Sequence, residues 1–282
     1  MTERIIEVVK SNGEREPFNR DKLLHSLRSA GADAAFASEV AAHVEKELVN
    51  GMKTEDIYRH AFEYLRTRKR PAAARYSLKR ALIELGPTGF PFERFVAEIF
   101  KARGYEASVE LVGKGKCIEH ELDVVAWNTA ELIVVEAKFH NTLGIKSDAK
   151  VALYVKARFD DLRETPFSCG GSETRRMSAG WLITNTKFTT NAIQYGECAG
   201  LRLVGWNYPR KGNLADLIEE TGLHPITCLT TLSTGEKQRL MEKGVVLCRS
   251  IRDEDEGLSA AGMTESSLDR AKEESRAVCP VN

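Results

Sequence analysis

The fold depends most on the stretch Glu121–Asn141, which reads ELDVVAWNTAELIVVEAKFHN. Two apolar runs in it flank a short polar break, a pattern that predicts two strands joined by a tight reversal. Side chains alternate between the faces of a strand, so Glu136 and Lys138 point the same way. The reversal folds Asp123 back to the level of Glu136. The stretch therefore predicts two carboxylates and one ammonium group at one place on an apolar sheet.

This charged cluster has two interpretations. Lys138 and Glu136 form an ordinary salt bridge on a solvent-facing sheet, with Asp123 incidental, or the three groups form a site. Leaving an unpaired ion in an apolar environment costs several kcal/mol, so such groups pair with each other or hold a metal. The offset between Asp123 and Glu136, and the apolar residues around them, favour a site.

The same residues carry a resemblance to a known family. Asp123, followed after the reversal by Glu136-Ala137-Lys138, resembles the D…E-x-K signature of the restriction-endonuclease-like nucleases, the PD-(D/E)-x-K superfamily, and in particular its Mrr-type branch. The flanking sequence is similar as well: F-E-x-x-V-A-x-I-F-x-x-x-G-Y, from Phe92, resembles the first helix of Mrr-type domains. G-W-L-I-T-N-x-x-F-T-x-x-A, followed by L-R-L-V, resembles their closing strand-helix-strand unit.

The resemblance implies an α/β domain with a mixed central sheet over residues 90–210, and a metal-dependent DNA endonuclease that hydrolyses phosphodiester bonds. It also implies that Asp123, Glu136 and the main-chain carbonyl of Ala137 hold Mg²⁺ or Mn²⁺, which prefer oxygen ligands. Lys138 then orients the attacking water. Glu93 is expected to assist as a further acid; its alternative role is that of an exposed glutamate at a helix start, favoured by the helix dipole. A nucleotide-responsive DNA-binding regulator with a silent nuclease fold is the second functional hypothesis.

Basic residues near the signature predict contacts with DNA. A helix expected over 146–162 carries Lys150, Lys156 and Arg158, which could hold the phosphate backbone or simply form a solvated face. The glycine-lysine turn 113–116 and the arginine pair 175–176 could also reach phosphates. We assign no role to the histidines.

Residues 1–86 predict a separate α+β domain, a β-hairpin followed by a helical bundle. Strands are expected over 4–10 and 14–18, and a turn at Ser11-Asn12-Gly13 joins them. Asn19 and Thr54 are expected to cap helices. The expected helices span 22–30, 38–49, 54–66 and 71–85.

The opening VVKSNGEREPFNRDKL, from Val8, resembles the start of an ATP-cone domain, whose pattern is V-x-K-R-D-G-x-x-E-x-F-D-x-x-K. The resemblance implies a regulatory site for ATP or dATP, with Val9, Lys10 and Lys22 as its contacts. Two ammonium groups and free backbone N–H groups suit a triphosphate. Ser11 stands where the family usually has arginine, which removes a bidentate phosphate donor. The matching positions are Val8, Lys10, Gly13, Glu16, Phe18 and Lys22.

The composition sets the remaining limits. The 282 residues suffice for two or more domains, and 41 basic and 41 acidic residues give zero net charge, so no global basic field indicates nucleic acid. No signal peptide or membrane helix is apparent, which predicts a soluble cytoplasmic protein without a membrane partner. The six cysteines lack metal-ligand spacing and are expected to be reduced thiols.

Residues 213–282 are expected to form a helical C-terminal segment. Gly244-Val245-Val246 and Gly262-Met263 leave open a helix-hairpin-helix arrangement beside a plain helical appendage. The chain is too short for the catalytic barrel of a ribonucleotide reductase, and it lacks the four-cysteine ribbon of reductase-gene repressors, two other classes of protein that carry an ATP cone. A homo-oligomer stays open.

Overall fold

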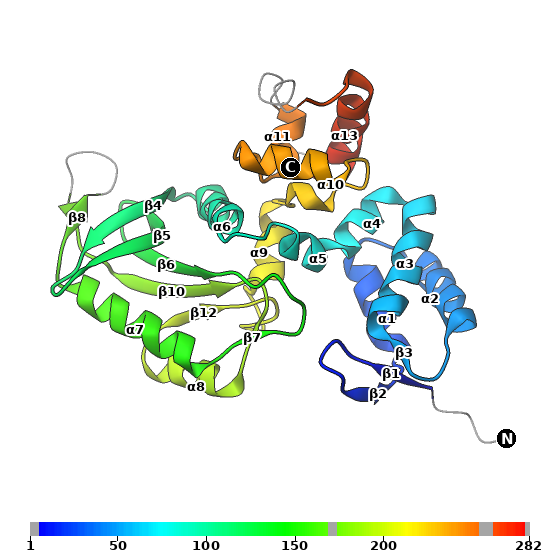
Figure 1. Ribbon diagram of the computed structural model, residues 1–282, viewed down its shortest axis with the longest axis horizontal. Coiled ribbons are helices and arrows are strands. Elements are labelled where there is room, and N and C mark those ends of the chain that lie inside the picture. The colour runs from blue at the N-terminus through cyan, green and yellow to red at the C-terminus, as the bar shows by residue number, and fades with distance from the viewer. Residues whose placement is uncertain (1–5, 169–173, 254–261, 280–282) are drawn as a thin grey trace. The chain divides into compact units, whose positions relative to one another are not determined.

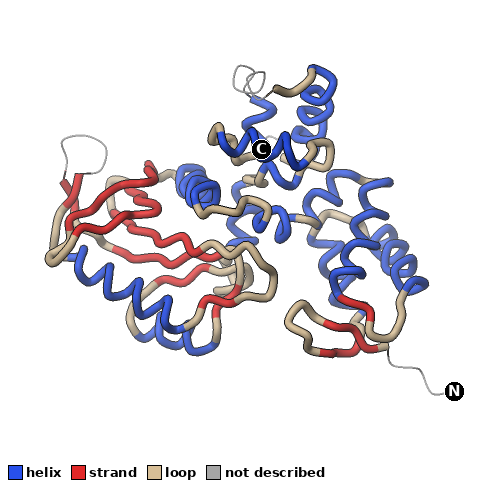
Figure 2. Tube along the Cα trace, viewed as in Figure 1, coloured by secondary structure: helices blue, strands red, loops and turns tan. Residues whose placement is uncertain are grey.

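The computed structural model describes residues 6–168, 174–253 and 262–279, which fold into two compact units (Figures 1 and 2). The first unit combines Met1–Ala81 with two C-terminal stretches, Ile226–Arg239 and Cys248–Asn282. The second unit comprises Leu82–Pro225 and Leu240–Leu247. Most of the C-terminal segment therefore belongs to the same unit as the N-terminal residues, whereas the sequence predicted the two as separate consecutive domains.

A small mixed sheet opens the first unit, in the strand order β2-β1-β3. The central strand β1 pairs antiparallel with β2, as the sequence predicts for the hairpin, and parallel with β3. Gly13 lies in the connecting turn with a φ of 84°, a conformation that favours glycine. The sequence does not predict β3, because a strand of only two residues shows no apolar periodicity. The strands are β1 (Glu7–Val9), β2 (Arg15–Pro17) and β3 (Met52–Lys53).

Of the five helices in this stretch, the first four pack with this sheet around a core of leucine, valine and alanine side chains. Asn19 caps the first helix as predicted, because its side chain accepts a hydrogen bond from the Lys22 backbone N–H at 2.9 Å. The helices are α1 (Arg20–Ser29), α2 (Ala34–Glu47), α3 (Thr54–Arg68), α4 (Arg70–Tyr76) and α5 (Leu78–Ile83).

Two local predictions in this region are wrong. Thr54 is the first residue of α3 and not its cap; the cap position is Lys53, which makes no side-chain capping bond. The helix predicted over 71–85 is divided at Ser77 into α4 and α5. The Ser77 hydroxyl donates to the Ala74 carbonyl at 2.8 Å, a local bond of the kind that competes with helix continuation.

C-terminal helices complete the first unit. The Thr227 hydroxyl donates to the Ala81 carbonyl at 2.6 Å, and Arg75 Nη2 donates to the Ala277 carbonyl at 3.1 Å. The helix-hairpin-helix interpretation of this segment stays a prediction. The elements are η1 (Ile226–Cys228), α10 (Thr234–Glu242), which begins in this unit, α11 (Cys248–Asp253) and α13 (Glu265–Val278).

The second unit is built on a five-stranded mixed sheet in the order β12-β10-β6-β5-β4. β5 pairs antiparallel with both β4 and β6, and β10 pairs parallel with both β6 and β12. Two short pairs, β7 with β11 and β8 with β9, lie outside it. The strands are β4 (Glu106–Lys114), β5 (Glu119–Trp127), β6 (Leu132–Lys138), β7 (Lys146–Ser147), β8 (Phe167–Ser168), β9 (Thr174–Arg175), β10 (Ala179–Thr184), β11 (Lys187–Phe188) and β12 (Arg202–Val204).

Helices cover this sheet (Figure 1). α7 and α8 share a buried cluster with Leu132 and Val134 of β6, while α6 contacts β4, β5 and β6. Glu136 lies two residues after Val134 on β6, so both side chains lie on the face that α7 covers. Within the described ranges, no helix combines the length and apolar character that crossing a bilayer requires. The helices are α6 (Phe90–Ala102), α7 (Ala149–Arg163), α8 (Thr190–Cys198) and α9 (Leu214–Thr221).

Candidate active site

The predicted signature residues meet where β5 and β6 lie side by side. The antiparallel pairing of the two strands ends with Val124 opposite Val135, and Asp123 and Glu136 come directly beyond this pair. Asp123 Oδ2 accepts a hydrogen bond from the Ala137 backbone N–H at 2.7 Å. The carboxylate of one strand is thus fixed to the main chain of the other, beside the second carboxylate.

Three carboxyl groups share one partly buried environment. Burial raises the pKa of Asp123, although the Ala137 N–H opposes the shift. Burial and the nearby Asp123 raise the pKa of Glu136 to about 7. Burial, followed by the charges of Asp123, Glu110 and Glu136, raises the pKa of Glu93 to about 7. Glu93, at the start of α6, therefore belongs to the same electrostatic cluster as the two strand carboxyls.

Two cations face these acids. Lys138 is exposed at the end of β6, and its charge lowers the pKa of both Asp123 and Glu136. Arg158, from α7, donates through Nη1 to Glu136 Oε2 and through Nη2 to the main-chain carbonyl of Glu121. The side chains of Arg158 and Glu136 are only 13% and 17% exposed, so this ion pair is largely shielded from water.

The basic helix differs from the predicted row of phosphate-binding cations. Arg158 turns toward the sheet and pairs with Glu136, because it lies beside the buried face of α7. Lys156 pairs with Asp160 one turn later on its own helix. Lys150 is exposed in the first turn. Arg158 is therefore engaged with Glu136 in this structure, and Lys150 is the most accessible of the three; that these residues hold a DNA backbone stays a prediction.

Two further acids near the site, Glu110 and Glu121, were not predicted from the sequence. On β4, Val109 pairs with Val124 and Leu111 pairs with Leu122, so Glu110 lies between these pairs, opposite Asp123. Glu110 has a φ of 56°, in the left-handed region that non-glycine residues rarely occupy. Glu121 lies two residues before Asp123 on β5, and its charge raises the pKa of Glu93. In the sequence, only the two-residue spacing between Glu121 and Asp123 could have indicated that Glu121 lies near the site.

The donor set suits a hard divalent cation. Burial, and after it the neighbouring carboxylates, raise the pKa values of Glu93 and Glu136 to about 7, so these acids are poorly compensated where they lie. In the parts of the chain that the structure describes, no three His, Cys, Asp or Glu side chains could hold a metal ion by themselves. A metal here would therefore depend on Asp123 and Glu136, together with main-chain oxygen and water.

The histidines beside the signature have structural partners. His120 Nε2 lies 2.9 Å from Asp161 Oδ2, and His140 Nε2 lies 2.9 Å from the Ser147 hydroxyl. Burial lowers the pKa of His140, and Lys138 adds to this. These contacts tie β5 to α7 and the chain after β6 to β7.

The other predicted phosphate contacts are only partly described. β4 extends through Lys114, so the turn begins at Gly115, whose N–H donates to the Ile118 carbonyl at 2.8 Å. Next to the arginine pair 175–176, Phe167–Ser168 and Thr174–Arg175 pair as β8 and β9, and residues 169–173, including Cys169, lie outside the described residues. Arg175 Nη1 donates to the Asn128 carbonyl.

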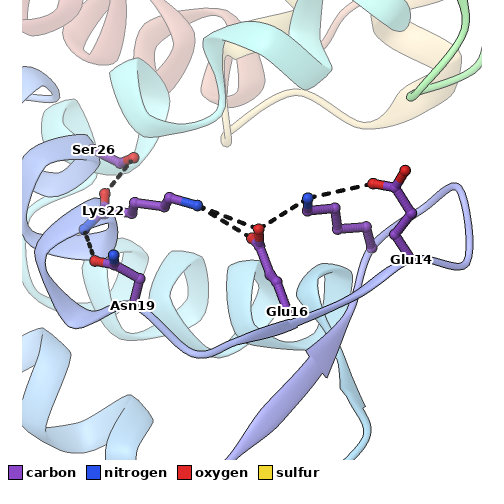
Figure 3. A network of polar contacts seen from close by, with 6 residues as sticks. Glu14, Glu16, Asn19, Lys22 and Ser26 are labelled. Carbon is purple, nitrogen blue, oxygen red and sulfur yellow. Dashed lines mark hydrogen bonds and ion pairs between the residues drawn. The ribbon is translucent and has the colours of Figure 1, made fainter.

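The predicted nucleotide contacts converge in the first unit. Lys10 Nζ lies 2.9 Å from Glu16 Oε2, and Lys22 Nζ lies 3.4 Å from Glu16 Oε1, so both ammonium groups share one carboxylate (Figure 3). Lys10 also lies 3.5 Å from Glu14. The hydrogen bond to Glu16 raises the pKa of Lys10. Val9 lies next to Lys10 at the end of β1.

Comparison with known proteins places this chain in a family. An uncharacterised protein of Archaeoglobus fulgidus is 35% identical over 156 residues, which are 55% of this chain and 83% of that protein. The crystal structure of a protein of unknown function, AF1548, superposes with a TM-score of 0.57 at 30% identity, over 68% of this chain and 98% of that one. Residues 224–279 match the model of the AF1548-like C-terminal domain. This chain belongs to the AF1548-like family.

The AF1548-like chain also contains the two predicted domains. Residues 6–83 match the ATP cone domain, and residues 87–207 match the restriction endonuclease family, which confirms the predicted fusion and its fold classes. A transcriptional repressor, NrdR of Lactobacillus acidophilus, is 36% identical over 50 residues, which are 18% of this chain and 32% of the repressor. The family thus supplies a nuclease fold and a nucleotide-binding domain, and the site residues stay predictions.

Proposed function

We propose that this AF1548-like chain is a nucleotide-regulated, Mg²⁺-dependent endonuclease that hydrolyses phosphodiester bonds of DNA. The observation that carries the proposal is the cluster of Asp123, Glu136 and Glu93 with Lys138, on a restriction-endonuclease-like sheet. A structural salt bridge would require one acid and one base. Here several partly buried acids converge instead, and burying so much like charge needs a functional reason.

Asp123, Glu136 and the carbonyl of Ala137 would hold Mg²⁺ or Mn²⁺. When bound, the metal polarises a phosphate and lowers the pKa of a water molecule. The Ala137 N–H fixes the Asp123 carboxylate through Oδ2, so its other oxygen is the one left for the ion. Glu93 would assist as the further acid, through the charge that it adds to the cluster.

Lys138 supplies mobile positive charge at the rim of the site. Its side chain is exposed, so it can approach a phosphate without displacing packed residues. An ammonium group there orients the attacking water and offsets the negative charge that develops on the phosphate in the transition state. The exposed Lys150 on α7 contributes to holding the DNA backbone.

The ATP cone would bind ATP or dATP through Val9, Lys10 and Lys22. The lysines already converge on one anion, the Glu16 carboxylate. A triphosphate would compete with Glu16 for both ammonium groups, so binding would rearrange this network. We propose that this rearrangement regulates cleavage.

The test is incubation of supercoiled plasmid with the full chain and Mg²⁺, with and without ATP or dATP. Wild type should nick the plasmid, Glu136→Ala should not, and Glu98→Gln on the outer side of α6 should behave as wild type. A change of rate with nucleotide would support regulation by the first domain. Equal nicking by wild type and Glu136→Ala would refute the proposed site.

A nucleotide-responsive DNA-binding regulator is the second candidate. The similarity to a transcriptional repressor over 50 residues favours it. The same plasmid experiment separates the two candidates: retardation of DNA that changes with nucleotide, without nicking by wild type, would indicate the regulator.

A further inference from the structure

Arg158 occupies an unusual position for a cation on an amphipathic helix. The buried face of α7 is formed by Ala152, Val155, Phe159 and Leu162. Arg158 stands between Val155 and Leu162 in the helical repeat, at the edge of that face. Its guanidinium therefore reaches the sheet, where it meets Glu136, and not the solvent.

Three contacts hold the guanidinium in place. Nη1 donates to Glu136 Oε2, and Nη2 donates to the main-chain carbonyl of Glu121. The ring of Tyr154, one turn earlier on α7, lies 5.6 Å from the guanidinium carbon, within cation-π range. Two of these contacts do not involve the acid. The guanidinium can therefore stay beside the cluster when Glu136 has another partner.

This pair conflicts with a metal at the same carboxylate. Glu136 Oε2 is engaged by the guanidinium, and the proposed metal needs the same carboxylate group. A divalent cation and a guanidinium this close to one carboxylate repel each other strongly at low exposure to water. Binding of the metal to Glu136 therefore weakens the ion pair of Glu136 with Arg158, and the ion pair weakens metal binding.

We propose that Arg158 is a positioning residue that stands in for the divalent metal at Glu136 and must release that carboxylate when the metal binds. The inference rests on the proposed function, since it assumes that Asp123 and Glu136 are the metal ligands. In the metal-free chain the guanidinium neutralises Glu136 and holds it in place between β6 and α7. After exchange, Glu121 and Tyr154 keep the freed guanidinium at the site, where it faces the anionic substrate. Arg158 thus sets the metal affinity of the empty site.

Mn²⁺ binding to the full chain without DNA tests this, measured by electron paramagnetic resonance of free Mn²⁺. Arg158→Gln removes the competing charge and should tighten Mn²⁺ binding roughly tenfold. Arg158→Lys keeps the charge and should stay near wild type. Lys156→Gln, which removes a cation paired on the surface of the same helix with Asp160, is the matched control and should not change the affinity. A residue that merely supported the fold would weaken metal binding when replaced.

Glu136→Gln separates this inference from the proposed function. If Glu136→Gln leaves Mn²⁺ binding intact, the proposed metal site itself is wrong. If Glu136→Gln abolishes binding but a folded Arg158→Gln binds Mn²⁺ as wild type does or more weakly, the role of Arg158 alone is overturned.

A second measurement uses the wild-type chain and does not depend on the folding of Arg158→Gln. Guanidinium NMR signals of ¹⁵N-arginine, assigned to Arg158 by their loss in Arg158→Lys, should shift as Mg²⁺ saturates the site. The signals of Arg66, in an exposed pair with Glu63, should not move. Unchanged Arg158 signals at saturating Mg²⁺ would overturn the exchange.

Discussion

Lys138 ends β6 with its ammonium group exposed beside two largely buried carboxyl groups. The proposed function gives it one task, to offset charge in the transition state. Lys138→Ala should keep the fold and Mn²⁺ binding and lower the nicking rate by about a hundredfold or more, as removal of one charge-stabilising group usually does. Plasmid nicking, thermal unfolding and Mn²⁺ binding measure the three properties. An unchanged nicking rate would contradict the assignment.

Glu110 carries backbone strain close to the site. Among the described residues it is the only non-glycine residue with positive φ, at 56°. Glycine adopts this conformation without the steric cost of a Cβ. Glu110→Gly should therefore be about 1 kcal/mol more stable to urea than Glu110→Ala. The comparison with alanine matters because both substitutions remove the exposed ion pair with Arg94.

The control for Glu110 is the same pair of substitutions at Glu119, an exposed residue of the neighbouring strand β5. There alanine should be the more stable replacement, since glycine weakens an ordinary strand. The same order of stability at both positions would show that Glu110 is not strained.

The raised pKa values of Glu93 and Glu136 predict how stability depends on pH. Both rise from 4.5 to about 7, chiefly through burial. The folded state then binds protons more tightly than the unfolded state. The stability from the neutral forms is present below about pH 4.5 and lost as the pH rises toward about 7. Metal-free wild type should become easier to unfold in urea across this interval, and Glu93→Gln should reduce that slope. Glu98→Gln, on the same helix and paired with Lys101, should keep it.

At the residue scale, the sequence indicates those site residues that are related by local geometry. Asp123, Glu136 and Lys138 lie on one hairpin, so strand alternation and a short reversal are enough to bring them together. Arg158 could not be assigned in this way. Its contact with Glu136 joins residues 22 positions apart and depends on how α7 turns against the sheet. The left-handed φ of Glu110 likewise leaves no mark on the sequence.

At the element scale, amphipathic helices and apolar strands were predictable, and short or divided elements were not. α6 and the strands β5 and β6 have strong apolar periodicity and a predicted type that holds. β3 is too short for any periodicity, and the break between α4 and α5 depends on one serine hydroxyl. Such elements are fixed by their tertiary surroundings more than by local propensity.

Asp161 of α7 holds the turn between β4 and β5. Its carboxylate accepts from the N–H groups of Cys117, at 2.8 Å, and Ile118, at 3.3 Å, and it contacts His120. The bond with His120 and the bonds from Cys117 and Ile118 lower the pKa of Asp161 to about 2. Asp161→Asn should weaken these bonds and release the turn. We expect amide hydrogen exchange at Cys117 and Ile118 to accelerate by roughly tenfold or more.

Asp160→Asn is the control for that prediction, because Asp160 is the exposed neighbour and pairs only along the helix with Lys156 in the contacts described. Exchange at the turn should be unaffected by it. Equal protection of Cys117 in Asp161→Asn and wild type would contradict a clamp. In wild type the clamp should also weaken as the pH falls from 3.8 toward 2, since a lowered folded pKa gives stability that is lost on acidification.

At the scale of the whole molecule, the chain closes its first unit with residues from both ends. Arg75 of α4 donates to main-chain carbonyls at the end of α13, and Thr227 donates to Ala81. The sequence predicted helices in the C-terminal segment but not their place in the first unit. These contacts join residues some 150 to 200 positions apart and leave no periodic pattern in the sequence. The sequence therefore predicts domains only as consecutive stretches of the chain. The nucleotide-binding domain and the C-terminal segment should therefore unfold together.

Glu274 of α13 gives the sharpest test of that joint unfolding. Its side chain is 5% exposed, and its carboxylate accepts from the backbone N–H and hydroxyl groups of both Thr230 and Thr231 at 2.7–3.0 Å. Glu274→Ala leaves these partly buried donors without their acceptor, which should destabilise the first unit by about 2 kcal/mol. The neighbouring Glu273 is exposed, so Glu273→Ala should have little effect.

Native-state hydrogen exchange on the full chain locates that destabilisation. In Glu274→Ala, the core amides of Val40 and Leu65, in the ATP cone, should exchange faster by the factor that corresponds to the lost stability. The amides of Val134 and Leu182, in the sheet of the nuclease fold, should keep wild-type rates, because they belong to the other unit. If only α13 itself exchanged faster, the C-terminal helices would be an appendage that docks on the ATP cone without contributing to its cooperative folding.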